Sequence, residues 1–185
     1  VFIDGMHLFE FVLRDFIAVE RCACPHSLVV IDDIYPCHPV QAARRRSSGA
    51  WTGDVWKFLK ILQSERPDLT LLPLNAYTTG LLVIAGMNPQ DTHLQAVYPE
   101  VVQKFRQVHD VPVDILARHG ALPSNNPALT TLVRCLKTAK AEHWSVAEVQ
   151  AGLRPVRKKA ERMVIAFQEQ AAAAPNTCDL ASLAA

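Results

Sequence analysis

The first third of the chain carries two kinds of hydrophobic pattern. Residues 1–4 and 28–31 are short apolar runs that end in acidic residues, a pattern typical of buried parallel strands. Between them, residues 7–19 place apolar side chains at helical spacing, with charged residues on the opposite face. Because two strands joined by a helix form a right-handed crossover, we expect these strands to be parallel neighbours in one sheet.

The next segment predicts a loop, a helix and a hairpin. Residues 34–50 are rich in Pro, Arg and Ser and predict a long loop with one helical turn. Residues 54–64 form a helical pattern that Thr52 is placed to cap. Residues 69–74 and 80–85 are apolar runs joined by a short turn, which favours antiparallel pairing. The pattern as a whole predicts an α/β sheet with an antiparallel strand near one edge.

The chain after Pro89 has helical spacing and alanine-rich faces. Residues 124–127 carry a helix-start signal, and Ser145 with Glu148 matches a capping box. Gly152 and Pro155 predict a break in the last helix. The predicted helices cover residues 95–109, 127–143 and 146–174.

We therefore divide the chain into an α/β unit, residues 1–89, and a helical extension, residues 90–185, with a frayed tail from residue 171. Half of the residues are apolar and the formal net charge is +1, so the chain has a globular composition without a polyelectrolyte character. Nucleic acid and membranes are not expected as partners. The sequence contains five cysteines without a CxxC pair. We expect free thiols and a cytoplasmic location, while a zinc site built from Cys22, Cys24, Cys37 and His38 fits no standard spacing.

Acidic residues follow two neighbouring strands of the predicted sheet. Asp4 ends the first apolar run, and Asp32 and Asp33 end the second. Ligands of open parallel sheets bind beyond the carboxyl ends of the strands. Carboxylate oxygens there suit Mg²⁺ or another divalent cation, and His7, three residues after Asp4, is a candidate general base. The plainer interpretation is that these side chains cap helices or bind loop amides.

A second group of candidate residues lies at the start of the helix over 54–64. Trp51 and Trp56 flank a Gly-Asp pair and, with Asp54, are candidates for lining an acceptor pocket. Arg44, Arg45 and Arg46 in the preceding loop are candidate contacts for an acidic substrate or a phosphate group. The alternative is structural: the tryptophans pack, Asp54 supports a helix cap, and the three arginines form a solvated basic loop.

These segments together resemble class I S-adenosylmethionine-dependent methyltransferases of the methyltransferase domain 24 group. The resemblance covers about residues 1–89 and rests on FIDGMHLFEFVLRDF, LVVIDDIYP, WTGDVWKFLKIL, RPDLTLLPL and TTGLLVIAG, in that order. In that family the fourth strand ends in Asp-Gly-x-His, the fifth ends in an acid pair, and the sixth and seventh form an antiparallel hairpin. The resemblance implies a partial Rossmann-like sheet, strands four to seven, followed by the helical region.

The resemblance also implies an activity. Related enzymes methylate sugar hydroxyls in macrolide pathways, with an acid on strand four and an acid pair after strand five holding Mg²⁺. Carried over, the metal ligands are Asp4, Asp32 and Asp33, Asp4 also borders the cofactor, and His7 is the base. The glycine-rich turn of the family is missing, so we expect a fragment whose parent binds S-adenosylmethionine and methylates a small molecule or sugar.

Two other classes remain compatible with the sequence. A metal-dependent hydrolase would use Asp4, His7 and Asp32, with His38 as a further ligand. A non-catalytic Rossmann-like module would act through its helical region. The exposed edge of the first strand and the helical tail are candidate surfaces for self-association.

Overall fold

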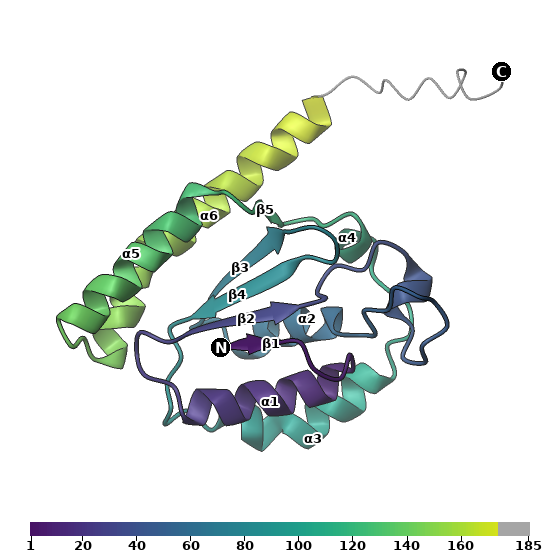
Figure 1. The fold of residues 1–185 in the computed structure, drawn as a ribbon, viewed down its shortest axis with the longest axis horizontal. Coiled ribbons are helices and arrows are strands. Elements are labelled where there is room, and N and C mark those ends of the chain that lie inside the picture. The colour runs from purple at the N-terminus through teal and green to yellow at the C-terminus, as the bar shows by residue number, and fades with distance from the viewer. Residues whose placement is uncertain (174–185) are drawn as a thin grey trace.

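The computed structural model describes the backbone of residues 1–173 and side chains as far as residue 166. A five-stranded sheet of order β1-β2-β4-β3-β5 lies between helices (Figure 1). The strands are β1 (Phe2–Ile3), β2 (Leu28–Asp32), β3 (Thr70–Asn75), β4 (Leu81–Ala85) and β5 (Leu122–Pro123). The helices are α1 (Phe9–Arg21), the 3₁₀ helix η1 (Pro39–Ala42), α2 (Trp56–Glu65), α3 (His93–Arg106), α4 (Val113–Leu116), α5 (Pro127–Ala141) and α6 (Val146–Ala173).

The sheet is mixed, and its pairing follows most of the pattern in the sequence. β1 and β2 are parallel, with Phe2 opposite Val30, as the crossover predicts. β3 and β4 form the expected antiparallel hairpin. The prediction that the antiparallel strand lies near one edge is wrong, because β4 is the middle strand and also pairs antiparallel with β2. The connection through α2 places β3 one strand away from β2 instead of next to it. The hairpin then places β4 between β2 and β3.

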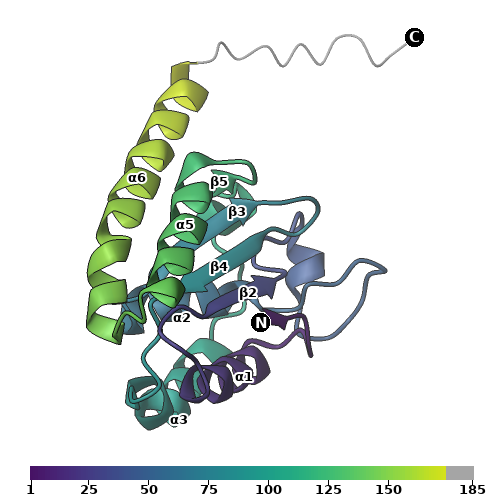
Figure 2. The same ribbon diagram turned by 60° about the vertical axis from the view of Figure 1, so that its left-hand side comes forward.

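Alternate residues of the strands face two separate cores. On β4, Leu82 and Ile84 point into the core formed with α1, α2 and α3, whereas Val83 and Ala85 point to the core formed with α5 and α6. This alternation is the two-residue period of a strand covered on both faces. Figure 2 shows α5 and α6 on one side of the sheet. Part of the region after Pro89 therefore forms one layer of the fold, since both helices pack on the sheet.

The helix ends follow the local signals of the sequence with two exceptions. Asn126 caps α5 by accepting a hydrogen bond from the Leu129 amide at 2.9 Å. Ser145 and Glu148 form the predicted capping box, in which the Glu148 carboxylate accepts from the Ser145 amide at 2.7 Å. Thr52 does not cap α2, because its hydroxyl donates to loop carbonyl oxygens instead.

The predicted break in the last helix is the second exception. α6 runs unbroken through Gly152 and Pro155. Gly152 is used for packing: a Cβ at this position would lie 2.6 Å from the Trp144 ring, so only glycine lets the two segments approach this closely. The expected frayed tail lies, from residue 174 onward, outside the described residues, as does Cys178.

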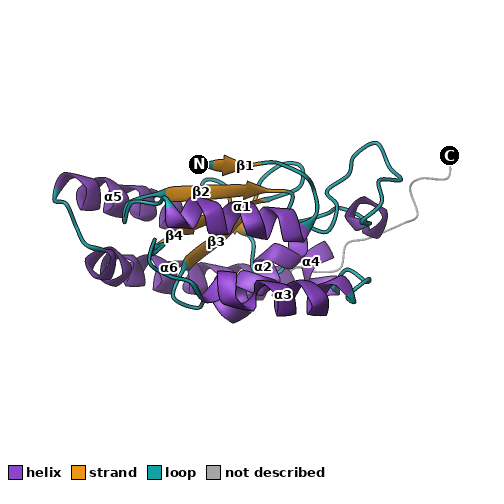
Figure 3. Ribbon diagram, turned by 90° about the horizontal axis from the view of Figure 1, so that it is seen from below, coloured by secondary structure: helices purple, strands orange, loops and turns teal. Residues whose placement is uncertain are grey.

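Three short elements shape the loops. η1 is the single turn expected within the long loop, whereas α4 and β5 are too short to leave a periodic signal in the sequence. Among the described helices, none is long and apolar enough to cross a bilayer. At the margin of the sheet, β1 pairs with β2 alone among the described strands, and Val1 and Phe2 are exposed there (Figure 3).

Candidate functional site

The carboxyl ends of β1 and β2 meet at one edge of the sheet because the two strands are parallel and adjacent. Asp4 directly follows β1, and His7 lies in the turn between β1 and α1. Asp32 is the last residue of β2, and Asp33 follows it with a φ of 65°. This left-handed conformation is uncommon for a residue with a side chain, although Asp tolerates it better than most. It gives the two adjacent carboxylates different directions.

Asp4, His7 and Asp33 converge at this edge. Each offers one ligand atom, and these atoms all lie within 4.8 Å of one another. His7 Nε2 lies 3.5 Å from an Asp4 carboxylate oxygen, and His7 Nδ1 lies 3.0 Å from Asp33 Oδ2. The Asp33 side chain is 12% exposed and that of Asp4 is 48% exposed, so the group opens to solvent on the Asp4 side.

The hydrogen bonds of His7 decide which ring nitrogen carries the proton in the neutral form. His7 Nδ1 lies 2.6 Å from the Trp51 carbonyl oxygen. A carbonyl oxygen can only accept, so Nδ1 must be the donor. The lone pair of the neutral ring is then on Nε2, which faces Asp4. His7 can therefore offer Nε2 either to a metal ion or to a substrate proton.

The segment after the long loop holds His7 in place. The Trp51 ring stacks on the His7 ring, with the centroids 5.2 Å apart and the planes 15° from parallel. The Trp51 indole donates to the Ala43 carbonyl oxygen at 2.6 Å. Gly53 has a φ of 55°, and a Cβ there would lie 1.6 Å from the His7 carbonyl oxygen. Only glycine permits this approach of the two backbones.

Asp32 does not join the three converging residues. Its carboxylate accepts a hydrogen bond from the Asp33 amide at 2.8 Å and one from the Thr79 hydroxyl at 3.4 Å. Of the acid pair predicted to bind a metal, the structure thus directs Asp33 into the cluster and uses Asp32 to fix the turn behind it. The sequence does not distinguish the two, because the orientation of Asp33 relative to Asp32 depends on the backbone conformation of Asp33, which has a φ of 65°.

The electrostatics of the cluster centre on Asp33. Burial raises the pKa of the Asp33 carboxyl, and the charges of Asp32 and Asp4 raise it further, while His7 and a hydrogen bond from Thr79 act in the opposite direction. Two acids that repel each other near a buried position favour the presence of a cation. The donor set also fits, since carboxylate oxygens and an imidazole suit Mg²⁺, Mn²⁺ or a first-row transition metal.

This is the one group of possible metal ligands among the residues that the structure describes. Cys22, Cys24 and Cys37 are free thiols and are not part of such a group, so the structure does not assemble the cysteine-based zinc site considered from the sequence.

The structure separates the other predicted site residues. Trp51 lies beside His7, with its ring stacked on the imidazole. Arg46 is exposed and donates to the carbonyl oxygens of Ser48 and Gly49 within its own loop. Trp56 is 2% exposed and belongs to the core beneath α2. Asp54 is 1% exposed and lies in a network of ion pairs.

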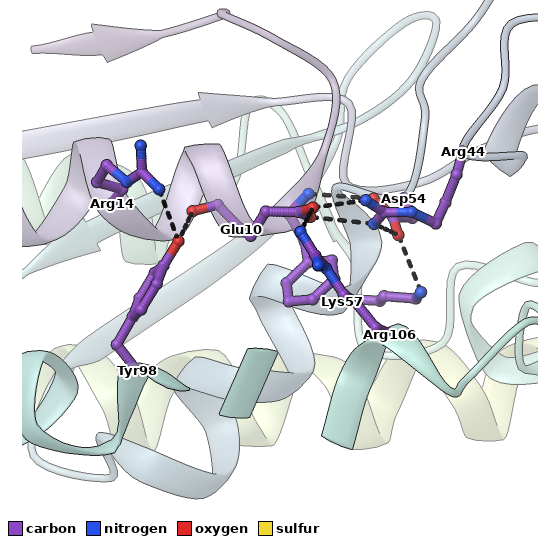
Figure 4. A network of polar contacts seen from close by, with 8 residues as sticks. Glu10, Arg14, Arg44, Asp54, Lys57, Tyr98 and Arg106 are labelled. Atoms are coloured by element: carbon purple, nitrogen blue, oxygen red, sulfur yellow. Dashed lines mark hydrogen bonds and ion pairs between the residues drawn. The ribbon is translucent and has the colours of Figure 1, made fainter. Parts of the chain in front are cut away.

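That network joins the long loop to α1, α2 and α3 (Figure 4). Asp54 accepts from Arg44 at 2.6 Å and from Lys57 at 2.9 Å, and its other oxygen accepts from the Phe9 amide at the start of α1. Glu10 on α1 binds Arg44 at 2.5 Å and Arg106 of α3 at 2.9 Å. Burial raises the pKa of Glu10, but hydrogen bonds from Arg44 and Arg106 outweigh it and lower this pKa to about 2. The long loop and α3 are therefore fastened to α1 close to His7.

Two residues near the cluster are not evident from the sequence. Thr79 sits in the hairpin turn and contacts Asp32. Arg118 follows α4 and reaches the same turn, where it binds Asn75 Oδ1 at 2.6 Å and the Thr78 carbonyl oxygen. Neither lies in a motif, and Arg118 is 40 residues away in sequence from the carbonyl group it binds.

Comparisons with protein-family models, with curated proteins and with solved structures found no match to this chain.

Proposed function

We propose that the protein holds a divalent cation through Asp4 and Asp33, with either His7 or a bound water as a further ligand. The cation would activate a hydroxyl group of a small molecule, which then accepts a methyl group from S-adenosylmethionine. The convergence of three ligand atoms within 4.8 Å at the carboxyl edge of the sheet carries this proposal. Ligand sites of open α/β sheets lie at this edge.

The choice of methyl transfer rests on the arrangement around the cluster. Asp4-Gly5-Met6-His7 follows β1, an acid pair ends β2, and β3 and β4 form an antiparallel hairpin. This order is the one that the resemblance to class I methyltransferases implies for strands four to seven. It supports the family as a proposal, together with a sugar or another small hydroxylated molecule as the acceptor.

Each residue of the site has a separate role in this proposal. A divalent cation, when bound, would supply Lewis acidity that lowers the pKa of a substrate hydroxyl group. The Asp4 and Asp33 carboxylates hold the positive charge at the sheet edge. His7 Nε2 takes the hydroxyl proton if it is not itself a ligand, and Trp51 keeps Nδ1 protonated and the ring oriented. Asp32 and Thr79 fix the backbone turn that directs Asp33.

The described residues do not fit the methyl donor in the same way. The turn after β1 contains Gly5 alone, and a Cβ there would make only an ordinary 3.5 Å contact with Asp15, so this turn is not a cradle that needs glycine. The sequence holds no Gly-x-Gly run. The residues of this chain therefore account for metal binding and for the proton of the acceptor hydroxyl, and not for binding of S-adenosylmethionine.

Mn²⁺ binding tests the metal site directly, because the free ion has an electron paramagnetic resonance signal that disappears on binding. Asp4→Asn and Asp33→Asn should each weaken Mn²⁺ binding by at least about 100-fold, since even loss of a residue that only orients a ligand costs about 10- to 100-fold. Asp110→Asn is the matched control, because Asp110 is exposed and distant in sequence from the cluster. Unchanged binding in the two cluster variants would remove the metal site from the proposal.

The reaction is tested with the protein in its full encoded length, methyl-labelled S-adenosylmethionine and a panel of hydroxylated acceptors. The expected result is label in the acceptor, lost with EDTA, restored by Mg²⁺ and reduced by His7→Gln. Metal-dependent cleavage of aryl esters without methyl transfer would replace the proposal with a hydrolase. Neither activity, with no Mn²⁺ bound, would favour a non-catalytic module.

A further inference from the structure

A cavity of about 590 Å³ lies between the hairpin turn after β3, the long loop and the segment after α4. Its volume falls in the range of about 300–1,000 Å³ that is usual for small-molecule sites. Cys37 and Gln41 come from the long loop, Tyr77 and Thr79 from the hairpin turn, and Arg118 from the far side. None of these five was expected from the sequence to bind a substrate.

Two contacts connect this cavity to the cluster. Thr79 lines the cavity, and its hydroxyl donates to the Asp32 carboxylate, whose neighbour Asp33 is a proposed ligand. On the other side, the Gln41 carbonyl oxygen accepts from the Thr52 and Gly53 amides, in the segment that backs His7. The cavity wall is therefore joined to the Asp32–Asp33 turn by one hydrogen bond through Thr79.

Arg118 gives the cavity its charge. Its guanidinium group donates to neutral partners: Asn75 Oδ1, the backbone carbonyl oxygens of Tyr35, Ala76 and Thr78, and the Cys37 sulfur at 3.2 Å. No carboxylate of the described part of the chain forms an ion pair with it, whereas Arg44 and Arg66 each contact two or more acids. The positive charge of a half-buried arginine is thus left uncompensated at a cavity wall, which favours an anion there.

The rim and the polarity of the cavity fit a small organic anion. Tyr77 is fully exposed at the mouth, where its ring can cover one face of a bound molecule. Gln41 and Thr79 supply neutral hydrogen-bonding groups. Bulk anionic polymers are a poor fit, because the net charge of the chain is only +1 and Arg118 is the one charged residue that lines the cavity.

We propose that this cavity is the acceptor subsite and that it takes a small hydroxylated molecule carrying a carboxylate or phosphate group, with Arg118 binding the oxyanion and the hydroxyl directed toward the Asp32–Asp33 turn. The assignment of the ligand as an acceptor rests on the proposed function, but the binding of an organic anion does not. Arg118 acts here as a binding residue.

Alkylation of Cys37 reports on occupancy of the cavity without any need for metal or methyl transfer. The probes are glycerate, glycerol 3-phosphate and, as the neutral analogue, glycerol, each with EDTA present, followed by iodoacetamide and mass spectrometry. Cys22 and Cys24 are exposed thiols after α1 and serve as internal controls. We expect either or both anions to slow alkylation of Cys37 at least about tenfold at saturation, with no effect on Cys22 or Cys24.

The comparison of the two anions separates a carboxylate site from a phosphate site, and inorganic phosphate alone shows whether the organic part contributes. Equal protection by glycerol, or slowing at all three cysteines, would overturn the proposal, as would no protection by either anion. Such a failure would leave the Mn²⁺ result untouched, while failure of methyl transfer would leave the protection of Cys37 untouched.

Variants at Arg118 complete the test. Arg118→Gln keeps hydrogen-bond donors but removes the charge. It should weaken binding of the anion by about tenfold or more, equivalent to about 1.4 kcal/mol. Arg118→Lys keeps the charge and should retain part of the protection even if the turn loosens. Arg134→Gln on the exposed face of α5 is the matched control for loss of one positive charge. Equal anion protection in Arg118→Gln and Arg134→Gln would rule out Arg118 as the anion-binding group.

Discussion

At the scale of single residues, the candidate site depends on a few backbone conformations. Asp33 and Gly53 both have positive φ values, and both lie against His7: Asp33 through its carboxylate and Gly53 through its backbone. A positive φ at Asp33 separates its carboxylate from that of Asp32. At Gly53 it allows two loops to touch without a side chain between them. The geometry of His7 therefore depends as much on these two residues as on its own ring contacts.

Gly53→Ala tests this dependence. The new Cβ would lie 1.6 Å from the His7 carbonyl oxygen, and alanine disfavours a φ of 55°. We expect a loss of about 1–3 kcal/mol in the free energy of unfolding, together with weaker Mn²⁺ binding because His7 must shift. Gly49→Ala, in the same loop, is the control, since nothing lies within 4 Å of its Cβ. Equal effects of the two substitutions on urea denaturation and on Mn²⁺ binding would contradict the prediction.

At the scale of elements, buried ion pairs fasten α1 to the loop, to α2 and to α3. A second network joins the opposite end of α1 to the end of α2. There Arg66 binds Glu20 at 2.7 Å and Asp68 at 2.8 Å. Such pairs add little stability relative to apolar side chains packed equally well. Removing one partner is nevertheless strongly destabilising, because it leaves a buried charge unpaired. The networks consequently specify how the helices are placed around the site.

Asp54→Asn tests the cost of leaving a buried charge unpaired. Lys57 is 2% exposed, and we expect loss of its partner to lower the free energy of unfolding, measured by urea denaturation, by about 3–5 kcal/mol. Asp114→Asn is the comparison, because it breaks an ion pair with Lys60 at a solvent-exposed position and should cost only about 0–1 kcal/mol. Adding Lys57→Met to Asp54→Asn should restore part of the stability. A double variant no more stable than Asp54→Asn would show that the unpaired lysine is not the cause.

Glu10 should make the protein less stable in acid. Its pKa in the folded state is about 2, below the ordinary value of 4.5, so ionised Glu10 stabilises the folded state. The contribution, on the order of 3 kcal/mol, is fully present above pH 4.5 and is lost as the pH falls toward 2. The difference in unfolding free energy between wild type and Glu10→Gln should shrink over that range. A difference that stays constant from pH 6 to pH 3 would refute the assignment.

At the scale of the whole molecule, the central strand β4 unites the two helical layers. It pairs with β2 and β3 along its full length, and its alternate side chains reach both cores. The helices of the two layers are separated in sequence but rest on the same strands. Loss of one layer would expose an apolar face of the sheet, so the layers should depend on each other for stability.

Two core substitutions test whether the molecule unfolds as one unit. Phe16→Leu removes packing between α1 and α2, whereas Leu153→Ala creates a cavity between α6 and the sheet. We expect Leu153→Ala to cost about 2–5 kcal/mol, with Phe16→Leu smaller, and each to lower the midpoint of a single transition. Far-ultraviolet circular dichroism and tryptophan fluorescence should then coincide for every variant. Two separate transitions, one sensitive to each substitution, would show that the layers fold independently.

The sequence by itself determined the local elements and the edge of the sheet at which chemistry is expected. Apolar runs ending in Asp4 and in Asp32-Asp33, with a helical pattern between them, specify two parallel strands, because side-chain periodicity and crossover handedness act over short distances. The helix-start signal at residues 124–127 and the capping box of Ser145 and Glu148 were equally local and were confirmed.

Tertiary structure alone decided the position of β4, the separate roles of Asp32 and Asp33, and the meeting of Cys37, Thr79 and Arg118 around one cavity. Strand order depends on which apolar edges remain unpaired after the crossovers have formed. The positive φ of Asp33 sets its orientation relative to Asp32, and Arg118 contacts a hairpin turn that is about 40 residues away in sequence. These outcomes depend on contacts between residues far apart in the chain, which leave no periodic pattern for a sequence to show.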